Sequence, residues 1–190
     1  KTVQININDT ANIDFSVADI CAGDTVEVTN NTNVQGGAIQ SYDWTIAGEN
    51  FSSKNPAKQI NVANTYDVKL VVTTTSGCKD SLTKQVDVNP VPVADYTVND
   101  STQCSNGNTF SFTDQSSISS GSISQSWTFG DGFTSSKADP SHTYQSSGSY
   151  ETELVVTSGE GCMDTTSKEM VVNPEPSVSF TYAEDSAQCF

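Results

Sequence analysis

Five cysteines and a single histidine are the residues of this chain best suited to specific chemistry. They are Cys21, Cys78, Cys104, Cys162, Cys189 and His142. No second histidine and no cysteine lies at metal-ligand spacing from it, so the sequence predicts no metal centre of the zinc type. No Gly-x-Ser-x-Gly elbow is present to carry a serine nucleophile. We therefore predict a protein that is not an enzyme, with no catalytic residue and no cofactor.

Acidic residues dominate the charge of the chain. Its 190 residues include 23 Asp and Glu against 8 lysines and no arginine, which gives a formal net charge of −15. Phosphate contacts and anionic membrane surfaces both require basic residues, so nucleic acid and membrane surfaces are excluded as partners. No run of about 18 apolar residues is present, and we expect no membrane insertion.

The polar composition favours strands and turns over helices. The chain contains 27 Ser, 23 Thr and 15 Asn, which compete with the helix backbone for hydrogen bonds. Short runs of alternating apolar and polar residues lie between turn signals, as in the seven residues Tyr150–Val156. This pattern predicts an all-β sandwich.

The sequence contains an internal repeat of about 84 residues. Two pairs of residues are offset by 83 positions and four by 84, namely Cys21/Cys104, Trp44/Trp127, Pro56/Pro140, Tyr66/Tyr150, Cys78/Cys162 and Pro90/Pro174. We predict a first domain over residues 12–90 and a second over 93–174. Residues 1–8 are interpreted as the closing strand of a preceding repeat and 177–190 as the opening strand of a following one, cut from a longer tandem array.

The second repeat resembles the PKD (polycystic kidney disease) domain. The resemblance is carried by Trp-Thr-Phe-Gly-Asp-Gly at 127–132, Asp-Pro-Ser-His-Thr-Tyr at 139–144, Gly-Ser-Tyr at 148–150 and Leu-Val-Val-Thr at 154–157. The first repeat is a degenerate version, with Ala-Gly-Glu at 47–49 in place of the Gly-Asp-Gly turn and Lys58 in place of His142. The resemblance implies tandem immunoglobulin-like β-sandwiches, with His142 as a strand residue whose ring is hydrogen bonded.

The Gly-Cys-x-Asp hairpin of each repeat resembles PKD variants in long secreted proteins of gliding or gut Bacteroidetes. That resemblance implies an extracellular, cell-surface location and a non-catalytic spacer or stalk role in a large adhesin of the gliding type. The alternative is a carbohydrate- or protein-binding accessory module of a secreted hydrolase. The expected partners are neighbouring repeats of the same chain and a surface polysaccharide, and we expect the isolated fragment to be monomeric.

Two disulfide pairings are open. Pairing within repeats joins Cys21–Cys78 and Cys104–Cys162 and closes loops of nearly 60 residues. In an immunoglobulin-like sandwich, however, the two cysteines of one repeat lie at opposite ends of a strand, and seven residues span roughly 23 Å. We therefore favour a bond between repeats, from Cys21 to Cys162, which leaves Cys78, Cys104 and Cys189 to pair with repeats outside this sequence.

Three further sites are hypotheses. A calcium ion at a domain junction would draw on acids near the linkers, for which the candidates are Asp14, Asp95, Glu175 and Asp185. Aromatic residues at loops or strand edges, which could stack on sugars, are Tyr42, Phe51 and Phe133. A pattern of Asp followed by Ser or Thr resembles the O-glycosylation acceptor of secreted Bacteroidetes proteins, with candidate acceptors at Thr10, Ser81, Ser101, Thr165 and Ser186.

Overall fold

The fold is taken from a computed structural model that describes residues 10–181. This part of the chain divides into two compact units. The first unit contains residues 10–92, 118–123 and 157–164, and the second contains residues 93–117, 124–156 and 165–181. The border at Pro92 and Val93 lies in the linker between the predicted domains, but two segments of the second repeat belong to the first unit.

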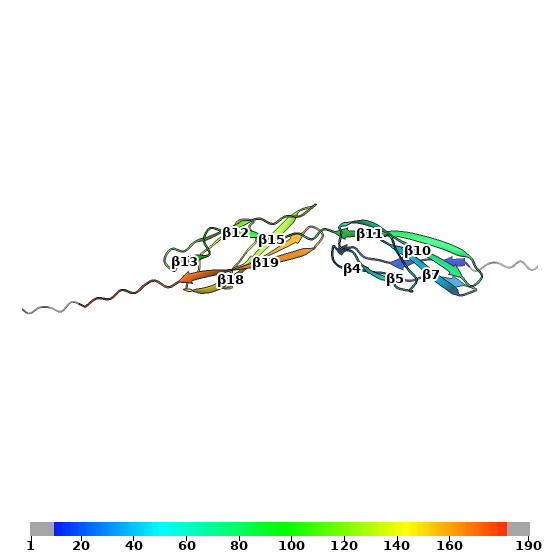
Figure 1. The fold of residues 1–190 in the computed structure, drawn as a ribbon, viewed down its shortest axis with the longest axis horizontal. Helices are drawn as coiled ribbons and strands as arrows, with labels where there is room; N and C mark the ends of the chain where they lie inside the picture. Colours follow the sequence, from blue (N-terminus) through cyan, green and yellow to red (C-terminus); the bar gives the residue numbers. More distant parts are fainter. Residues whose placement is uncertain (1–9, 182–190) are drawn as a thin grey trace, which may run out of the picture. The chain divides into compact units, whose positions relative to one another are not determined.

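The first repeat is built from strands only. They are β1 (Thr10–Asn12), β2 (Phe15–Ser16), β3 (Ile20–Cys21), β4 (Thr25–Glu27), β5 (Thr29–Asn30), β6 (Asn33–Gln35), β7 (Ile39–Ile46), β8 (Glu49–Phe51), β9 (Ala57–Gln59), β10 (Asn64–Thr74) and β11 (Lys79–Asn89). One sheet has the order β3-β11-β10-β7-β8, and the facing layer is made of the pairs β2-β5 and β4-β9, with β1-β6 as a further pair. Figure 1 shows β10 running beside β11 and β7.

The core of the first repeat lies on one face of this sheet. Along β10, Val68, Leu70 and Val72 are fully buried, whereas Asp67 and Lys69 are exposed. Trp44 of β7 packs edge-on against Phe15 of β2, with the ring centroids 5.1 Å apart. The period of two along these strands therefore places the apolar residues between the two layers.

The second repeat has the same plan. Its strands are β12 (Tyr96–Val98), β13 (Thr102–Cys104), β14 (Phe110–Asp114), β15 (Ile123–Thr128), β16 (Thr134–Ser135), β17 (Ser141–His142), β18 (Gly148–Ser158) and β19 (Met163–Asn173). The five-stranded sheet has the order β13-β19-β18-β15-β16, and the facing sheet has the order β12-β14-β17. Each strand of the larger sheet corresponds to one in the sheet of the first repeat.

Aromatic side chains fill the second core. Tyr96, Phe112 and Trp127 are buried and pack against one another, with ring centroids 5.0 to 5.9 Å apart. The two contacts of Tyr96 are edge-to-face, an arrangement that adds to the stabilisation from burial. The predicted all-β, immunoglobulin-like fold is confirmed, and no helix is present among residues 10–181.

The predicted terminal strands fall mostly outside this description. Residues 1–8 lie outside the described residues, as do 182–190. Residues 177–181 form no strand. A strand needs a neighbour to complete its hydrogen-bond ladder, and residues 177–181 pair with no strand among residues 10–181.

Candidate functional site

Cys21 is placed by the short strand β3. This strand runs parallel to the end of β11, with Cys21 opposite Asn89. The next N–H along the chain, that of Ala22, donates to the Asn89 carbonyl oxygen at 2.8 Å. These bonds fix the cysteine beside the last residue of β11.

Cys162 lies in the tight turn between β18 and β19. The Ser158 N–H donates to the Cys162 carbonyl oxygen at 2.8 Å, and the Cys162 N–H donates to the Ser158 hydroxyl at 3.0 Å. Gly161 has φ 85°, a left-handed conformation that suits glycine. The turn therefore holds the cysteine backbone from both sides, and its side chain is fully buried.

Cys21 and Cys162 form a disulfide, and their Cα atoms are 5.7 Å apart. Both residues belong to the first compact unit, although Cys162 belongs to the second repeat by sequence. The bond spans a sequence separation of 141 residues. A covalent link therefore joins the start of the first repeat to the last hairpin of the second.

The pairing within repeats is absent from the structure. Cys78 and Cys104 carry no disulfide. Within the first repeat, Cys21 lies beside Asn89 at the end of β11, whereas Cys78 precedes the first residue of that strand. The 11 residues of β11 extend over roughly 36 Å, far beyond the reach of a disulfide. The strand was predicted to be seven residues long, which was too short. The two cysteines of the first repeat still lie at opposite ends of a strand, and the distance between them is larger than predicted.

The Gly130-Asp131-Gly132 turn is a structural element of the second repeat. Both glycines have positive φ, 80° and 93°. The Asp131 Oδ2 atom lies 2.7 Å from His142 Nε2, and both side chains are largely buried. The His142 ring also stacks on Phe129, with centroids 4.2 Å apart. The histidine is a strand residue with a hydrogen-bonded ring, and this geometry offers no nucleophile.

The first repeat replaces this pair with another. Lys58 forms an ion pair with Glu49, so a charged pair joins the same two parts of the fold with different residue types. Ala47, which stands where the second repeat has Gly130, has φ 45°. The degenerate turn therefore keeps its left-handed backbone.

Two of the four acids proposed for calcium, Asp14 and Asp95, already form ion pairs. Lys84 Nζ lies 3.0 Å from Asp14 Oδ1, and Lys168 Nζ lies 3.2 Å from Asp95 Oδ1. The hydrogen bond from each lysine is the main cause that lowers the pKa of the aspartate it contacts. Glu175 is exposed, and Asp185 lies outside the described residues. Within residues 10–181 no three His, Cys, Asp or Glu side chains gather into a metal site.

The roles of these two lysines were not predicted from the sequence. Each also donates to a backbone carbonyl, Lys84 to that of Phe15 and Lys168 to that of Tyr96. A signal was present, because Lys84 and Lys168 share the 84-residue offset of the repeat. Nothing in their local sequence distinguished them from other surface lysines.

The proposed glycosylation acceptors lie on strands and at turns. Ser81 and Thr165 lie on β11 and β19, Ser101 precedes β13, and all three are exposed. Thr10 begins β1. Ser186 lies outside the described residues. The three exposed hydroxyls are accessible to a modifying enzyme.

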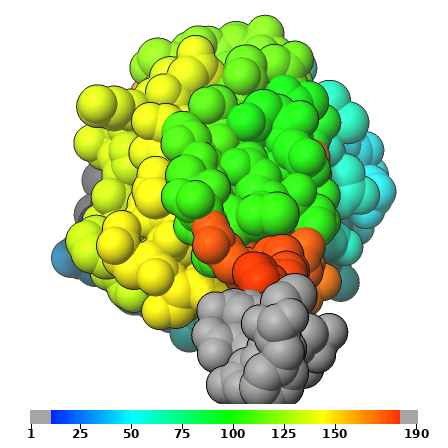
Figure 2. Space-filling model, turned by 90° about the vertical axis from the view of Figure 1, so that its left-hand side faces the viewer, coloured from blue at the N-terminus to red at the C-terminus, as the bar shows by residue number. Residues whose placement is uncertain are grey.

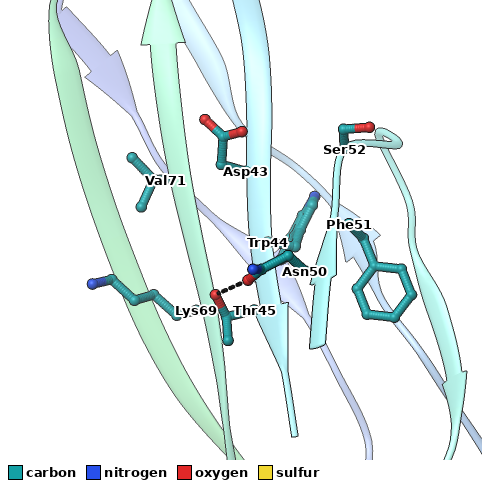
Figure 3. Close-up of a pocket in the computed structure, with 8 residues that line it drawn as sticks. All are labelled: Asp43, Trp44, Thr45, Asn50, Phe51, Ser52, Lys69 and Val71. Atoms are coloured by element: carbon teal, nitrogen blue, oxygen red, sulfur yellow. Dashed lines mark hydrogen bonds between the residues drawn. The ribbon is translucent and has the colours of Figure 1, made fainter. Parts of the chain in front are cut away.

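A shallow groove lies along β7, β8 and β10 of the first repeat (Figure 3). It has a volume of about 430 Å³ and is lined by Asp43, Trp44, Thr45, Asn50, Phe51, Ser52, Lys69 and Val71. The Thr45 hydroxyl donates to Asn50 Oδ1 at 3.0 Å, which Figure 3 shows as a dashed line. Trp44 is buried, with its Nε1–H bonded to the Ser53 carbonyl oxygen, so the groove offers no indole face to a sugar.

The three aromatic candidates do not form one surface. Tyr42 and Phe51 are half-buried in the first unit, and in Figure 3 the Phe51 ring points away from Lys69. Phe133 is 62% exposed and belongs to the second unit. No stacking platform is built from these side chains together.

Among residues 10–181, no helix is long and apolar enough to cross a bilayer.

The topology and core define an all-β protein of immunoglobulin-like repeats. Residues 89–172 match the PKD domain family. The chain also covers 99% of the crystal structure of the PKD1 domain of Vibrio anguillarum Epp, with 31% sequence identity over 46% of this chain and a TM-score of 0.41. Residues 89–172 of this chain therefore belong to the PKD domain family.

Two curated relatives are collagenases. Collagenase ColA of Bacillus cereus is 37% identical over 68 residues, which is 36% of this chain and 7% of that protein. A microbial collagenase of Vibrio alginolyticus is 34% identical over 85 residues, 45% of this chain and 10% of that protein. The chain therefore spans no more than a tenth of the length of either relative, and what it shares with them is a non-catalytic module.

Proposed function

We propose that the chain is an extracellular spacer that carries mechanical load in a longer cell-surface protein, such as the stalk of an adhesin. The observation that carries the proposal is the disulfide between Cys21 and Cys162. A disulfide of this kind is typical of secreted proteins, since the cytosol keeps thiols reduced. The relatives contain this module within collagenases, which fits a supporting role beside another functional part.

The disulfide provides a load path that bypasses most of the chain. Tension that enters before Cys21 and leaves after Cys162 passes through the S–S bond rather than through the intervening 141-residue separation. The buried Trp44 and Trp127, and most strands of both sheets, lie inside the bypassed segment. A spacer built in this way resists extension even when a core is locally destabilised.

A single-molecule pulling experiment tests this role. The chain is held at its two ends, and its extension is followed with the disulfide oxidised and after reduction. The segment between Cys21 and Cys162 should add about 480 Å of contour length only after reduction. The variant Cys21→Ser/Cys162→Ser should extend fully under both conditions, whereas Cys78→Ser/Cys104→Ser, which loses as many cysteines, should behave like the unmodified chain. Full extension of the oxidised chain would rule out the load-bearing role.

A second candidate function is that of an accessory module which binds the substrate of a secreted hydrolase. The relationship to PKD-containing collagenases favours it, and the groove lined by Asp43, Asn50 and Lys69 is the surface it would use. Titration of the chain against collagen peptides and against a panel of polysaccharides tests this candidate. Binding that Lys69→Ala and Asn50→Ala abolish would support it, and the absence of binding would leave the spacer role.

Glycosylation of the exposed acceptors would fit the spacer. We propose Ser81, Ser101 and Thr165 as acceptors together with Thr10 and Ser186, because polar glycans keep neighbouring acidic stalks hydrated. Intact-mass and peptide analysis of natively secreted protein would detect the modification. Unmodified hydroxyls at all five positions would refute it.

A further inference from the structure

We propose that Cys78 and Cys104 are the two halves of a further disulfide, each of which joins this chain to another copy of the same repeat. Cys104 of one copy would bond to Cys78 of the next. The inference goes beyond the spacer role and does not depend on it. It rests on the bonded pair Cys21 and Cys162, whose positions Cys104 and Cys78 repeat in the fold.

Cys104 has the backbone setting of Cys21. It ends β13, which runs parallel to β19, and lies opposite Asn173 as Cys21 lies opposite Asn89. The N–H of the following residue, Ser105, donates to the Asn173 carbonyl oxygen at 2.8 Å, the same bond that fixes the residue after Cys21. The two cysteines are therefore held by equivalent ladders at the same end of their sheets.

Cys78 has the backbone setting of Cys162. The Thr74 N–H donates to the Cys78 carbonyl oxygen at 2.9 Å, and the Cys78 N–H donates to the Thr74 hydroxyl at 3.2 Å. Ser158 makes both of these bonds with Cys162. Gly77 has φ 84° and Gly161 has φ 85°, so the two turns share one conformation.

The difference between the two sets lies in burial. Cys162 is fully buried, whereas Cys78 is only partly so. Cys21 is partly buried, whereas Cys104 is exposed. Figure 2 views the second repeat with residues near 100–110, in green, at the surface. Each unbonded cysteine thus has the backbone of its bonded counterpart and lacks the cover that its counterpart has.

The surroundings of the bonded pair indicate what provides that cover. Asn89 and Pro90 line a cavity of about 300 Å³ together with the turn residues Ser158, Gly159 and Glu160 and the loop Ser120–Ser122. Residues at the equivalent positions accompany the unbonded cysteines. Asn173, the last residue of β19, is followed by Pro174, and the turn Thr74-Thr75-Ser76 precedes Cys78. Each unbonded cysteine therefore stands in the setting of one cysteine of the Cys21–Cys162 disulfide. The partner that it lacks is the corresponding cysteine of another repeat of this kind.

The linkage forms by thiol–disulfide exchange with an external disulfide such as oxidised glutathione. The Cys104 thiolate attacks one sulfur, which forms a mixed disulfide and releases a glutathione thiolate. The Cys78 thiolate of the second copy then attacks the protein sulfur of that mixed disulfide and releases the second glutathione thiolate. The two cysteines lose two protons and two electrons, and one oxidised glutathione becomes two reduced molecules. The Ser76 hydroxyl donates to the Cys78 sulfur.

The test mixes two single-thiol chains. Both carry Cys189→Ser, which removes the cysteine outside the described residues, and both retain Cys21 and Cys162. One carries Cys78→Ser and the other Cys104→Ser. In oxidised glutathione each chain alone should remain monomeric, and the mixture should give a disulfide dimer that peptide mapping assigns to Cys104 and Cys78.

A relocated thiol serves as the matched control. Ser101 is exposed and precedes the same strand. Adding Cys104→Ser and Ser101→Cys to the chain that already carries Cys78→Ser and Cys189→Ser therefore places an accessible thiol outside the proposed position. When this chain replaces the one that carries Cys104, the mixed dimer should be lost. The proposal is overturned if no mixed dimer forms, if like chains couple as readily as unlike ones, or if the relocated thiol couples as readily as Cys104.

Discussion

The Lys168 ammonium lies 4.5 Å from the centroid of the Tyr96 ring. It also lies 3.2 Å from Asp95 Oδ1 and donates to the Tyr96 carbonyl oxygen. Lys84 makes the corresponding contacts with Asp14 and Phe15 in the first repeat, with the ammonium 5.1 Å from the ring centroid. In each repeat, one lysine of the larger sheet, on β11 or β19, thereby contacts the first strand of the facing layer, β2 or β12, and links the two layers of the sandwich.

Replacement of Lys168 by methionine should release this contact and keep the apolar stem. The Lys168 hydrogen bond is the largest cause of the lowered Asp95 pKa, so that pKa should rise toward 3.8 in the variant. Loss of the cation–π contact with Tyr96 should lower the free energy of unfolding by about 0.5–1 kcal/mol. Carboxyl NMR titration and urea unfolding measure the two effects.

The sign of the pH dependence follows from the lowered pKa of Asp95. Its contribution to stability is present above pH 3.8 and is lost as the pH falls through the folded value. Lys168→Met should remove that part of the acid dependence. Lys137→Met provides the control, because Lys137 has no ion pair among residues 10–181. An unchanged Asp95 pKa in the Lys168 variant would show that the contact is absent in solution.

Tyr96 should titrate late. Burial raises its pKa to about 12 from the usual 10.0, and its hydroxyl donates to the Thr152 carbonyl oxygen at 2.8 Å. Because the folded pKa is the higher one, this stabilisation is complete below pH 10 and is lost as the pH rises from 10 toward 12. The free energy of unfolding should fall over that range, and Tyr96→Phe should show a weaker fall. Urea unfolding at pH 8 and pH 11 measures this fall in the unmodified chain and in the Tyr96→Phe variant. An equal fall in both would disprove the assignment to Tyr96.

Gly130 should tolerate substitution less well than Gly132. A Cβ at Gly130 would lie 2.7 Å from the Glu151 carbonyl oxygen and 2.9 Å from its nitrogen, whereas nothing lies within 4 Å of one at Gly132. Both substitutions to alanine strain a left-handed backbone, and only Gly130→Ala also displaces the main chain of β18. Gly130→Ala should lower the free energy of unfolding, measured with urea, by about 1–3 kcal/mol more than Gly132→Ala does. Equal losses would mean that the strand moves aside at no cost.

Local patterns could be predicted well from this sequence, and tertiary contacts only in part. The alternation along Tyr150–Val156 identified the buried face of β18, because a period of two needs no knowledge of distant residues. The positive φ of Ala47 could not be foreseen from its residue type, since alanine rarely adopts it. The assignment of residues 157–164 to the first unit depends on contacts between segments far apart in sequence. The lysines Lys84 and Lys168 were missed for the same reason.

The pair formed by Asp131 and His142 should contribute strongly to the stability of the second repeat. Their side chains are 14% and 11% exposed, so His142→Leu leaves a carboxylate with little access to water. We expect a loss of about 1.5–3 kcal/mol, and a smaller loss from the same change in an Asp131→Asn background. Lys58→Leu in the first repeat is the internal comparison, because its partner Glu49 is 63% exposed and remains hydrated. Urea unfolding of the four chains of the His142/Asp131 double-mutant cycle and of Lys58→Leu measures these losses. If His142→Leu and Lys58→Leu destabilise the chain equally, burial of the acid is not the cause.

The disulfide between Cys21 and Cys162 should stabilise both repeats through the unfolded state. It closes a separation of 141 residues, and the chain-entropy relation for a loop of that size gives about 5 kcal/mol. Trp44 and Trp127 are buried, one in each repeat, so single-tryptophan variants report the unfolding of each core by fluorescence. Reduction should move both transitions to lower guanidinium concentration, and Cys21→Ser/Cys162→Ser should do the same without reductant. Cys78→Ser/Cys104→Ser should leave both transitions in place. A shift confined to one tryptophan would mean that the bond acts on one repeat by local contact and not by restricting the unfolded chain.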